Sequence, residues 1–362
     1  MQENERVTPL TLRKKFALEV WRCQENIMQS EHPLRQLFWE CTLRCNLNCR
    51  HCGSDCRSNA RQKDMPKEDF MRVLDSIAAK IDPHKVFVNV TGGEPLMRTD
   101  LEECCAEIYA KGFPWCLVTN ALYLTPQRFV KLLKAGMHSM TISIDGLEEL
   151  HNWMRGNAKS FQRVDNALNM LAVTPELTFD VVTCVNRRNY VQLDAIKAYL
   201  IKKGVKRWRV FTVFPVGRAS ADPDMRLSDV EFRGVLDFIR QSQKEGQIRT
   251  EYGCEGFLGN YEGEVRQHFF TCQAGVSIGS VLADGSISGC TSIRADYHQG
   301  NIYKDDFMDV WEKSFHPYRD RRWMKKDNCE ECNYWRYCHG NGMHLRDSEG
   351  KLLLCHLKRL QH

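Results

Sequence analysis

Three cysteines near the start of the chain have the residue type and spacing best suited to chemistry. Cys45, Cys49 and Cys52 form a CxxxCxxC run that follows the apolar stretch 37–39. Thiolates this close together can bind three irons of a [4Fe–4S] cluster and leave the fourth iron without a protein ligand. Because such an iron can take a ligand from outside, the spacing indicates a reactive cluster rather than one that only stores electrons.

A zinc site or a set of free thiols is the alternative. Zinc sites usually pair one CxxC with a second CxxC or with histidine, and His51, Cys41 and Cys56 lie close by in the sequence. We favour the cluster, and we expect Cys41 and Cys56 to lie outside it, on the preceding strand and beyond the loop.

A second set of cysteines lies in the last third of the chain. Seventeen cysteines in all, in a protein expected to be cytoplasmic, argue for metal or redox chemistry and against a disulfide framework. Seven of them follow residue 245: Cys254, Cys272, Cys290, Cys329, Cys332, Cys338 and Cys355. The last four suit either a complete iron–sulfur cluster or a four-cysteine zinc site. Five others lie in apolar patterns typical of small core residues: Cys23, Cys104, Cys105, Cys116 and Cys184.

The composition argues against several classes of function. The net charge is +5, from 51 basic and 46 acidic residues, and no basic stripe interleaved with aromatics predicts a nucleic-acid site. No segment approaches the ~20 apolar residues of a membrane helix, and the polar residues 1–6 are not a signal peptide. We therefore expect a cytoplasmic protein that binds no nucleic acid and spans no membrane.

The elements that must position these residues alternate between strand and helix. Six strands are predicted, at 37–41, 86–91, 115–119, 140–144, 179–185 and 209–213. Helical patterns lie between them, at 67–80, 101–111, 126–135, 160–172 and 189–203. Alternation of this kind implies an α/β fold with a parallel sheet, which right-handed crossovers curl into a partial (β/α)6, TIM-like barrel.

Three parts are expected in a chain of 362 residues, which exceeds the size at which a single core stops growing. A helical segment spans 1–35, with an amphipathic helix over 8–33 whose apolar residues pack across the end of the next domain. The part-barrel spans 36–245 and ends with a helix near 227–243. A cysteine-rich extension spans 246–362.

The distinctive short sequences all follow predicted strands. The first strand leads to Cys45–Cys52 and the second to Thr91–Pro95. Thr119–Asn120 ends the third strand and Ser143–Gly146 ends the fourth. Because chemistry in such barrels gathers at the C-terminal ends of the strands, these loops are expected to share one mouth.

These motifs, in this order, resemble those of the radical S-adenosylmethionine (SAM) superfamily, and the resemblance covers residues 36–215. The motifs are Cys45-x3-Cys49-x2-Cys52, Gly92-Gly93-Glu94-Pro95, Ser143-Ile144-Asp145-Gly146 and His151-Asn-Trp-Met-Arg155-Gly156. The resemblance implies an enzyme in which SAM binds the open iron and is reductively cleaved to a 5′-deoxyadenosyl radical, which abstracts hydrogen from a substrate.

The resemblance also implies which residues bind SAM. Gly92 and Gly93 let the backbone approach the ligand, and Glu94 helps to hold the methionyl amino group. Ser143 and Arg155 donate to the methionyl carboxylate. His51 stands where relatives usually have an aromatic residue beside the adenine. The expected set is completed by Pro95, Asn120 and Asp145.

The last third resembles the SPASM extension, which carries auxiliary iron–sulfur clusters. The expected ligands are Cys272, Cys290, Cys329, Cys332, Cys338 and Cys355. Relatives have a further cysteine where this chain has Gly342, so one ligand is missing. The cluster at Cys272 and Cys290, with Cys254 as a third candidate, is absent, has an open iron or uses a ligand other than cysteine. One or two auxiliary clusters are expected.

Members with this layout mostly modify peptides or proteins, so we expect a maturase that acts on a peptide or protein and takes electrons from a flavodoxin or ferredoxin. Sulfatase-maturing relatives carry an acidic base where Cys290 is followed here by Thr291–Ser292, which weakens that assignment. Segments 11–22 and 37–45 resemble a subgroup paired with a small lipoprotein, which makes a lipoprotein precursor a candidate substrate.

Two alternatives stay open: a radical SAM enzyme acting on a small metabolite, and a non-catalytic iron–sulfur or zinc scaffold. No catalytic residue can be chosen, because a general base must reach a substrate proton and the sequence holds no geometry. The candidates for a base are Asp180, Tyr252, Glu255, His268 and Asp284.

Overall fold

The computed structural model describes residues 9–360 and contains one curved sheet of ten strands. The polar segment 1–6 and the start of the expected helix at residue 8 lie outside the described residues. The strands are β1 (Gln36–Glu40), β2 (Phe87–Thr91), β3 (Trp115–Thr119), β4 (Met137–Ser143), β5 (Thr178–Val185), β6 (Arg207–Thr212), β7 (Arg249–Tyr252), β8 (Ile278–Val281), β9 (Ser286–Ser288) and β10 (Gly300–Asn301). Their order is β10-β9-β8-β1-β2-β3-β4-β5-β6-β7, parallel from β8 to β7.

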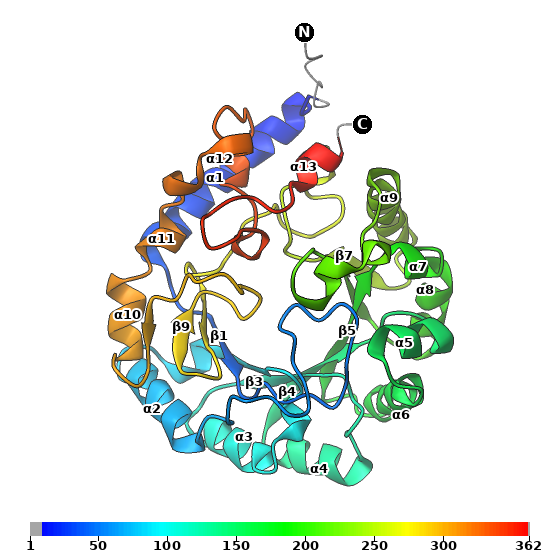
Figure 1. Ribbon diagram of the computed structural model, residues 1–362, viewed down its shortest axis with the longest axis vertical. Helices are drawn as coiled ribbons and strands as arrows, with labels where there is room; N and C mark the ends of the chain where they lie inside the picture. Colours follow the sequence, from blue (N-terminus) through cyan, green and yellow to red (C-terminus); the bar gives the residue numbers. More distant parts are fainter. Residues whose placement is uncertain (1–8, 361–362) are drawn as a thin grey trace.

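The sheet curls into an open barrel, and helices cover its outer face (Figure 1). They are α2 (Lys67–Ala78), α3 (Leu101–Ala110), α4 (Pro126–Lys134), α5 (Glu148–Arg155), α6 (Ser160–Ala172), α7 (Arg187–Tyr190), α8 (Leu193–Lys202) and α9 (Asp229–Glu245). The predicted α/β, TIM-like architecture is confirmed. The helix predicted over 189–203 is two helices, α7 and α8, and α5 was not predicted.

The core of the barrel lies between the sheet and its helices. Trp39 of β1 stacks on Phe70 of α2 with ring centroids 4.3 Å apart, and Trp115 and Trp208 are fully buried on β3 and β6. Strands covered on both faces read as near-continuous apolar runs, which is why the six strands were visible in the sequence.

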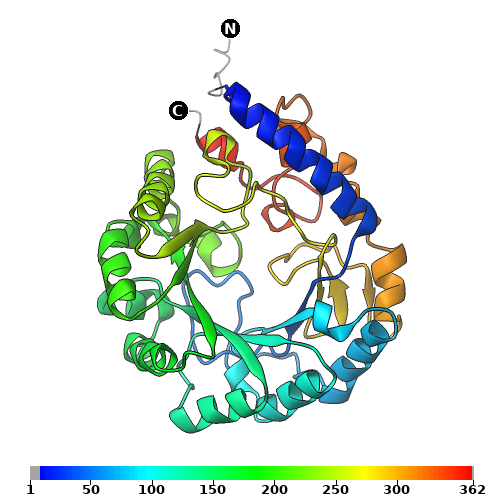
Figure 2. The ribbon, with the colours of Figure 1, turned by 180° about the vertical axis from the view of Figure 1, so that it is seen from behind.

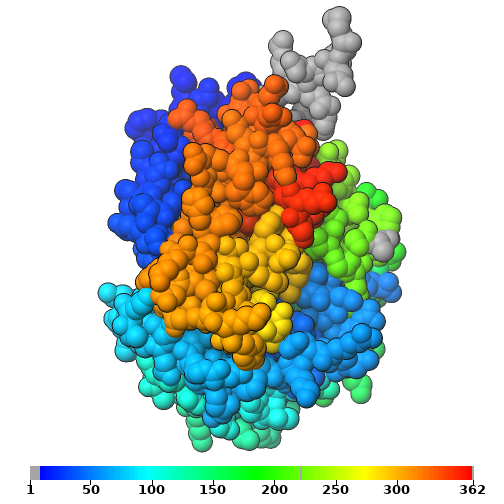
Figure 3. All heavy atoms as spheres, turned by 60° about the vertical axis from the view of Figure 1, so that its left-hand side comes forward, coloured from blue at the N-terminus to red at the C-terminus, as the bar shows by residue number. Residues whose placement is uncertain are grey.

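The C-terminal third continues the same sheet. β8 pairs in parallel with β1, and β9 and β10 follow it as antiparallel strands. β7 lies beyond residue 245 and pairs with β6, so the sheet crosses the expected domain boundary, which remains a prediction. Figure 3 shows this third, from yellow to red, packed against the first elements of the chain. Its short helices are α10 (Phe307–Lys313), α11 (His316–Arg319), α12 (Trp335–Cys338) and α13 (His356–Arg359).

The first helix, α1 (Leu12–Glu31), runs along the C-terminal third (Figure 2). The apolar residues expected to pack, Leu12, Phe16 and Val20, are instead exposed. Leu18 of the same helix packs in a buried cluster with Phe257, Phe270 and Leu357. Polar contacts add to it: the Trp21 indole donates to the Thr271 hydroxyl at 2.9 Å, and other hydrogen bonds reach Glu262, Arg336 and Tyr337. No helix among residues 9–360 is long and apolar enough to cross a membrane.

Candidate functional site

A cavity of about 320 Å³ opens at the C-terminal ends of the parallel strands. Ten of the residues expected at a SAM-binding cluster line it: Cys45, Cys49, Cys52, His51, Gly92, Gly93, Glu94, Asn120, Ser143 and Arg155. Pro95 and Asp145 do not line it. Pro95 begins a short 3-10 turn that Glu94 caps, and Asp145 is buried behind Arg155.

The sulfurs of the cysteine loop receive hydrogen bonds from their surroundings. The Asn120 amide donates to the Cys45 sulfur at 3.9 Å, and a guanidinium N–H of Arg155 donates to the Cys49 sulfur at 3.7 Å. Burial raises the pKa of Cys45 to about 12, so this thiol keeps its proton at neutral pH until a metal binds the sulfur and displaces the proton. Donors aimed at buried sulfurs fit thiolate ligands of a cluster, whose potential such bonds tune.

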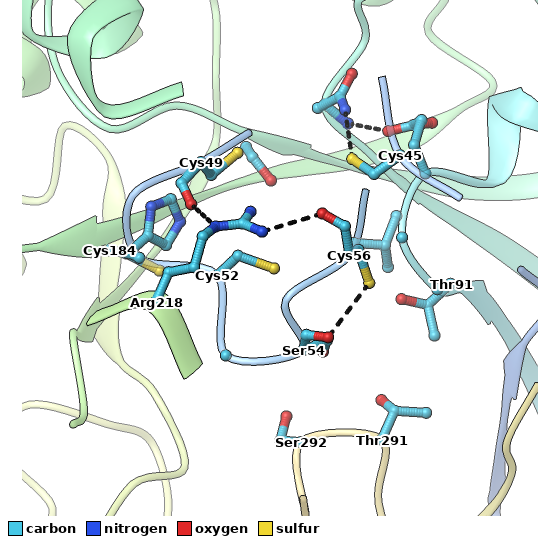
Figure 4. Close-up of a pocket in the computed structure, with 18 of the residues that line it drawn as sticks. Cys45, Cys49, Cys52, Ser54, Cys56, Thr91, Cys184, Arg218, Thr291 and Ser292 are labelled. Atoms are coloured by element: carbon cyan, nitrogen blue, oxygen red, sulfur yellow. Dashed lines mark hydrogen bonds between the residues drawn. The ribbon is translucent and has the colours of Figure 1, made fainter. Parts of the chain in front are cut away.

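Cys56 lies at the same cavity, although the sequence placed it beyond the loop. Its thiol donates to the Ser54 carbonyl at 3.9 Å, and its contact with the Cys52 sulfur lowers the pKa of Cys52. Figure 4 shows both sulfurs facing the cavity. Cys41, by contrast, is buried away from the cavity, where its carbonyl accepts from Arg98 at 2.9 Å.

The neighbouring backbone leaves no room for a side chain on the two glycines after β2. Gly92 has φ +145, and a Cβ on Gly92 or Gly93 would collide with the carbonyl oxygens of Thr42 or Arg44. The Gly93 N–H donates to the Thr42 carbonyl at 2.7 Å. The glycines therefore also allow a close approach to the segment that leads into Cys45, and their approach to a ligand stays a prediction.

Glu94 joins the loops that follow β2 and β3. Its carboxylate accepts from the Thr119 hydroxyl at 2.7 Å, the Asn120 N–H at 2.8 Å and the Leu96 N–H at 3.1 Å. Burial raises its pKa. Three of about four acceptor positions on a carboxylate are used, which leaves one for a ligand's amino group.

Arg155 and Asp145 form a buried ion pair behind the cavity, with Nη2 and Oδ2 2.7 Å apart. Burial is the largest influence on the pKa of Asp145 and would raise it, but the charge of Arg155 and smaller contributions from other neighbours together lower it. Burial lowers the pKa of His51 to about 4, so its ring is neutral. Among the described residues, His51 Nδ1 and Arg155 Nε are buried without a hydrogen-bond partner. Orphaned polar atoms beside the cavity fit a bound polar ligand such as SAM.

A small constellation of possible metal ligands adjoins this pair. One nitrogen of His51, a carboxylate oxygen of Asp145 and the sulfur of Cys184 all lie within 4.8 Å of one another. Cys184, which was expected to be a core residue, lines the cavity. Cys23, another expected core residue, is exposed on α1.

Arg218 is a cavity residue that the sequence analysis missed. It follows Gly217 in the segment after β6, and its N–H groups donate to the carbonyls of Cys49 at 2.7 Å, Cys52 at 3.0 Å and Cys56 at 3.1 Å. The cysteine loop is thereby clamped from the far side of the barrel. The one indication of Arg218 in the sequence was that it lies in the segment after the last predicted strand of the barrel.

The C-terminal third supplies the opposite wall of the cavity. Thr291 and Ser292, which follow Cys290, face the cysteine loop across the cavity (Figure 4). Arg294 lines the same wall and pairs with the buried Glu40 of β1 at 2.9 Å. The lining side chains from this third were not predicted as site residues.

The C-terminal cysteines form two groups, and none of them lines this cavity. Desolvation and then the charges of Cys290 and Cys272 raise the pKa of Cys254 to about 12, although Cys254 is exposed at the surface, so the three thiols lie within electrostatic reach of one another. In the second group the charges of the thiols likewise raise one another's pKa; its members are Cys329, Cys332, Cys338 and Cys355. Within the described chain, no three of these sulfurs lie within 4.8 Å of one another.

None of the five candidate bases is among the residues that line the cavity. Asp180 pairs with Arg209 at another pocket of the barrel, Asp284 is exposed in the β8–β9 turn, and His268 lies beside Trp21. Glu255 comes nearest to the cavity. Its carboxylate accepts a hydrogen bond from the backbone N–H of Thr212, a cavity residue, at 2.7 Å and another from the Tyr252 hydroxyl. This carboxylate is buried inside the protein.

Comparison with protein families matches two parts of the chain. Residues 39–199 match the radical SAM superfamily, and residues 272–334 match an iron–sulfur cluster-binding domain, SPASM.

The individual proteins that are similar to this chain have been named for different functions. An AdoMet-dependent heme synthase of Methanosarcina barkeri is 27% identical over 324 residues, covering 84% of this chain and 90% of that protein. The mycofactocin maturase MftC of Mycolicibacterium smegmatis is 27% identical over 312 residues, covering 85% and 77%. Streptococcus suis SuiB bound to the precursor peptide SuiA has a similar fold, with a TM-score of 0.68 at 16% identity over 88% of this chain and 74% of that chain.

Proposed function

This chain belongs to the radical SAM superfamily and carries a SPASM iron–sulfur domain, and from its site we propose that it modifies a side chain of a peptide or protein substrate by hydrogen abstraction. When bound, a [4Fe–4S] cluster and SAM supply a 5′-deoxyadenosyl radical. The observation that carries the choice of substrate is the charge and size of the cavity.

Apart from the Nε of Arg155, which is kept for SAM, the arginines of the cavity in the described part of the chain are committed to protein partners. Three arginines line it, and each pairs with a carboxylate at 2.7–2.9 Å: the pairs are Arg155–Asp145, Arg218–Asp55 and Arg294–Glu40. A substrate with several carboxylates, such as a tetrapyrrole, would need free cations to bind it. A neutral side chain is the better fit.

The size of the cavity also bears on the substrate. About 320 Å³ is near the lower end of the ~300–1,000 Å³ usual for small-molecule sites, and the cluster and SAM would fill it. A substrate would therefore approach from outside, past Thr291 and Ser292, and a side chain on a peptide can do so while its backbone stays outside.

Within this proposal the chain's own residues hold and orient the cofactors. Cys45, Cys49 and Cys52 would bind the cluster, and Glu94 has an acceptor position left for the methionyl amino group. Ser143 and the unpartnered Nε of Arg155 would meet the methionyl carboxylate, and the neutral ring of His51 would lie beside the adenine. Asp145 positions Arg155 rather than touching SAM.

The partners remain part of the proposal. An electron must reach the cluster from a donor such as flavodoxin or ferredoxin, and a small lipoprotein precursor is a candidate substrate. Both fit a protein that works in the cytoplasm. A tetrapyrrole is the second candidate, because one group of relatives is named for heme synthesis.

Anaerobic incubation of the cluster-loaded protein with SAM, reductant and either candidate peptides or iron-coproporphyrin tests the choice. We expect a mass change on a peptide, dependent on SAM and read by mass spectrometry. Ser292→Trp should fill the substrate side and abolish that change, while Lys131→Trp on the exposed face of α4 should not. Turnover of the porphyrin with none of the peptides would contradict the proposal.

A further inference from the structure

Cys254, Cys272 and Cys290 share one site but are one ligand short of a cluster with four protein ligands. The iron–sulfur family match begins at residue 272 and leaves Cys254 unassigned. The fourth ligand must come from whatever other segment runs past these thiols.

Gly342 leads into the 3-10 turn Met343–Leu345. The Met343 N–H donates a hydrogen bond to the Cys272 sulfur. On the other side, the carbonyl oxygen of Glu255, the neighbour of Cys254, lies 2.9 Å from the place where a Cβ on Gly342 would stand. This segment therefore borders the three-thiol site.

The imidazole of His344 occupies the space that a side chain at position 342 would need. Its Cε1 lies 2.6 Å and its Nδ1 2.9 Å from the Cβ position of Gly342. A residue with a side chain at position 342 would displace the ring, so the ring of His344 can lie here because residue 342 is glycine. The ring also lies 4.9 Å, centroid to centroid, from Phe214, which lines the SAM cavity.

Two other polar side chains near this segment, Glu255 and Asn341, are already engaged. Glu255 accepts from the Thr212 N–H at 2.7 Å and contacts His356 at 3.3 Å. Asn341 accepts from the Phe257 N–H at 3.0 Å and donates to the Leu354 carbonyl at 3.2 Å.

We propose that His344 is the fourth protein ligand of an auxiliary [4Fe–4S] cluster held by Cys254, Cys272 and Cys290. Imidazole binds iron well, and replacing a thiolate by a neutral ring raises the potential of a cluster. The iron bound to His344 would lie on the side of Phe214 and the cavity, where a more oxidising cluster is best placed to accept an electron from a substrate radical. The proposal rests on the iron–sulfur assignment and not on the identity of the substrate.

The test uses the full chain with Cys45, Cys49 and Cys52 changed to alanine, so that only the C-terminal clusters remain. The protein is reconstituted with iron and sulfide under anaerobic conditions, reduced, and studied by pulsed EPR with and without ¹⁵N-histidine. We expect a nitrogen coupling that changes with the isotope. In His344→Cys the coupling should vanish while the iron content is kept, because a thiolate replaces the ring.

His339→Ala, next to Cys338 of the other cysteine group, serves as the matched control and should keep the coupling. A spectrum without histidine nitrogen, or a coupling that survives His344→Cys, would overturn the proposal. An unchanged iron content in Cys254→Ala would do so as well, because that thiol would then hold no cluster. These spectra need no substrate, so a failed peptide assay leaves them unaffected.

Discussion

The cysteine sulfurs proposed to hold a cluster are defined as much by their hydrogen-bond donors as by their spacing. Asn120 directs a donor at the Cys45 sulfur, and Arg155 directs one at the Cys49 sulfur. Donors of this kind stabilise the reduced, more negative cluster and so raise its potential. At this scale the protein controls how easily the cluster takes an electron.

Asn120→Leu should lower the reduction potential of this cluster. A weak hydrogen bond to sulfur contributes ~0.5–1 kcal/mol, which for one electron is ~20–40 mV. A redox titration followed by EPR measures the shift, with Asn166→Leu on the exposed face of α6 as the control. An unchanged potential would show that the amide does not tune the cluster.

The sequence could predict the identity of these residues but not their contacts. CxxxCxxC and the residues at strand ends were visible because their spacing is local. The donor to Cys45 comes from 75 residues further along, and no local pattern records such a pair. Cys56 was set aside on spacing alone, although the loop folds back and brings it beside Cys52.

At the scale of elements, the cysteine loop is held from three directions. The glycine loop after β2 bonds to its start, and the end of α5 bonds to Arg50, whose N–H donates to the Met154 carbonyl at 2.9 Å. Arg218 after β6 clamps its remaining carbonyls. The loop is thereby fixed before any cluster binds, which reduces the entropy cost of binding.

Arg218→Ala should weaken retention of this cluster. Hydrogen bonds from a charged donor contribute ~1.5–3 kcal/mol, so we expect iron to be lost to a chelator about 10- to 100-fold more readily. The exposed Arg226→Ala, in the same segment, should behave as wild type. Equal iron loss in the two variants would argue against the clamp.

The long, buried elements could be predicted and the short ones could not. Six strands and most helices of the barrel were expected near their observed bounds because their apolar runs are continuous. α5 has only eight residues, about two turns, and β7–β10 have two to four residues each, so their periodicity is too short to see.

At the scale of the whole molecule, the C-terminal third completes the site. β8 pairs with β1 although they are some 240 residues apart in the chain, and this pairing carries Thr291 and Ser292 to the wall opposite the cysteine loop. The sequence predicted two cysteine-rich regions but not their union in one sheet, because long-range pairing leaves no local pattern. The cavity therefore belongs to both.

The most direct test of the account is whether the cavity cleaves SAM. The fully loaded protein, incubated anaerobically with SAM and a strong reductant, should release 5′-deoxyadenosine, measured by liquid chromatography and mass spectrometry. The Cys45→Ala, Cys49→Ala, Cys52→Ala variant should release none while keeping the iron of its C-terminal clusters. Absence of 5′-deoxyadenosine from the loaded wild type, or equal release from the variant, would contradict the account.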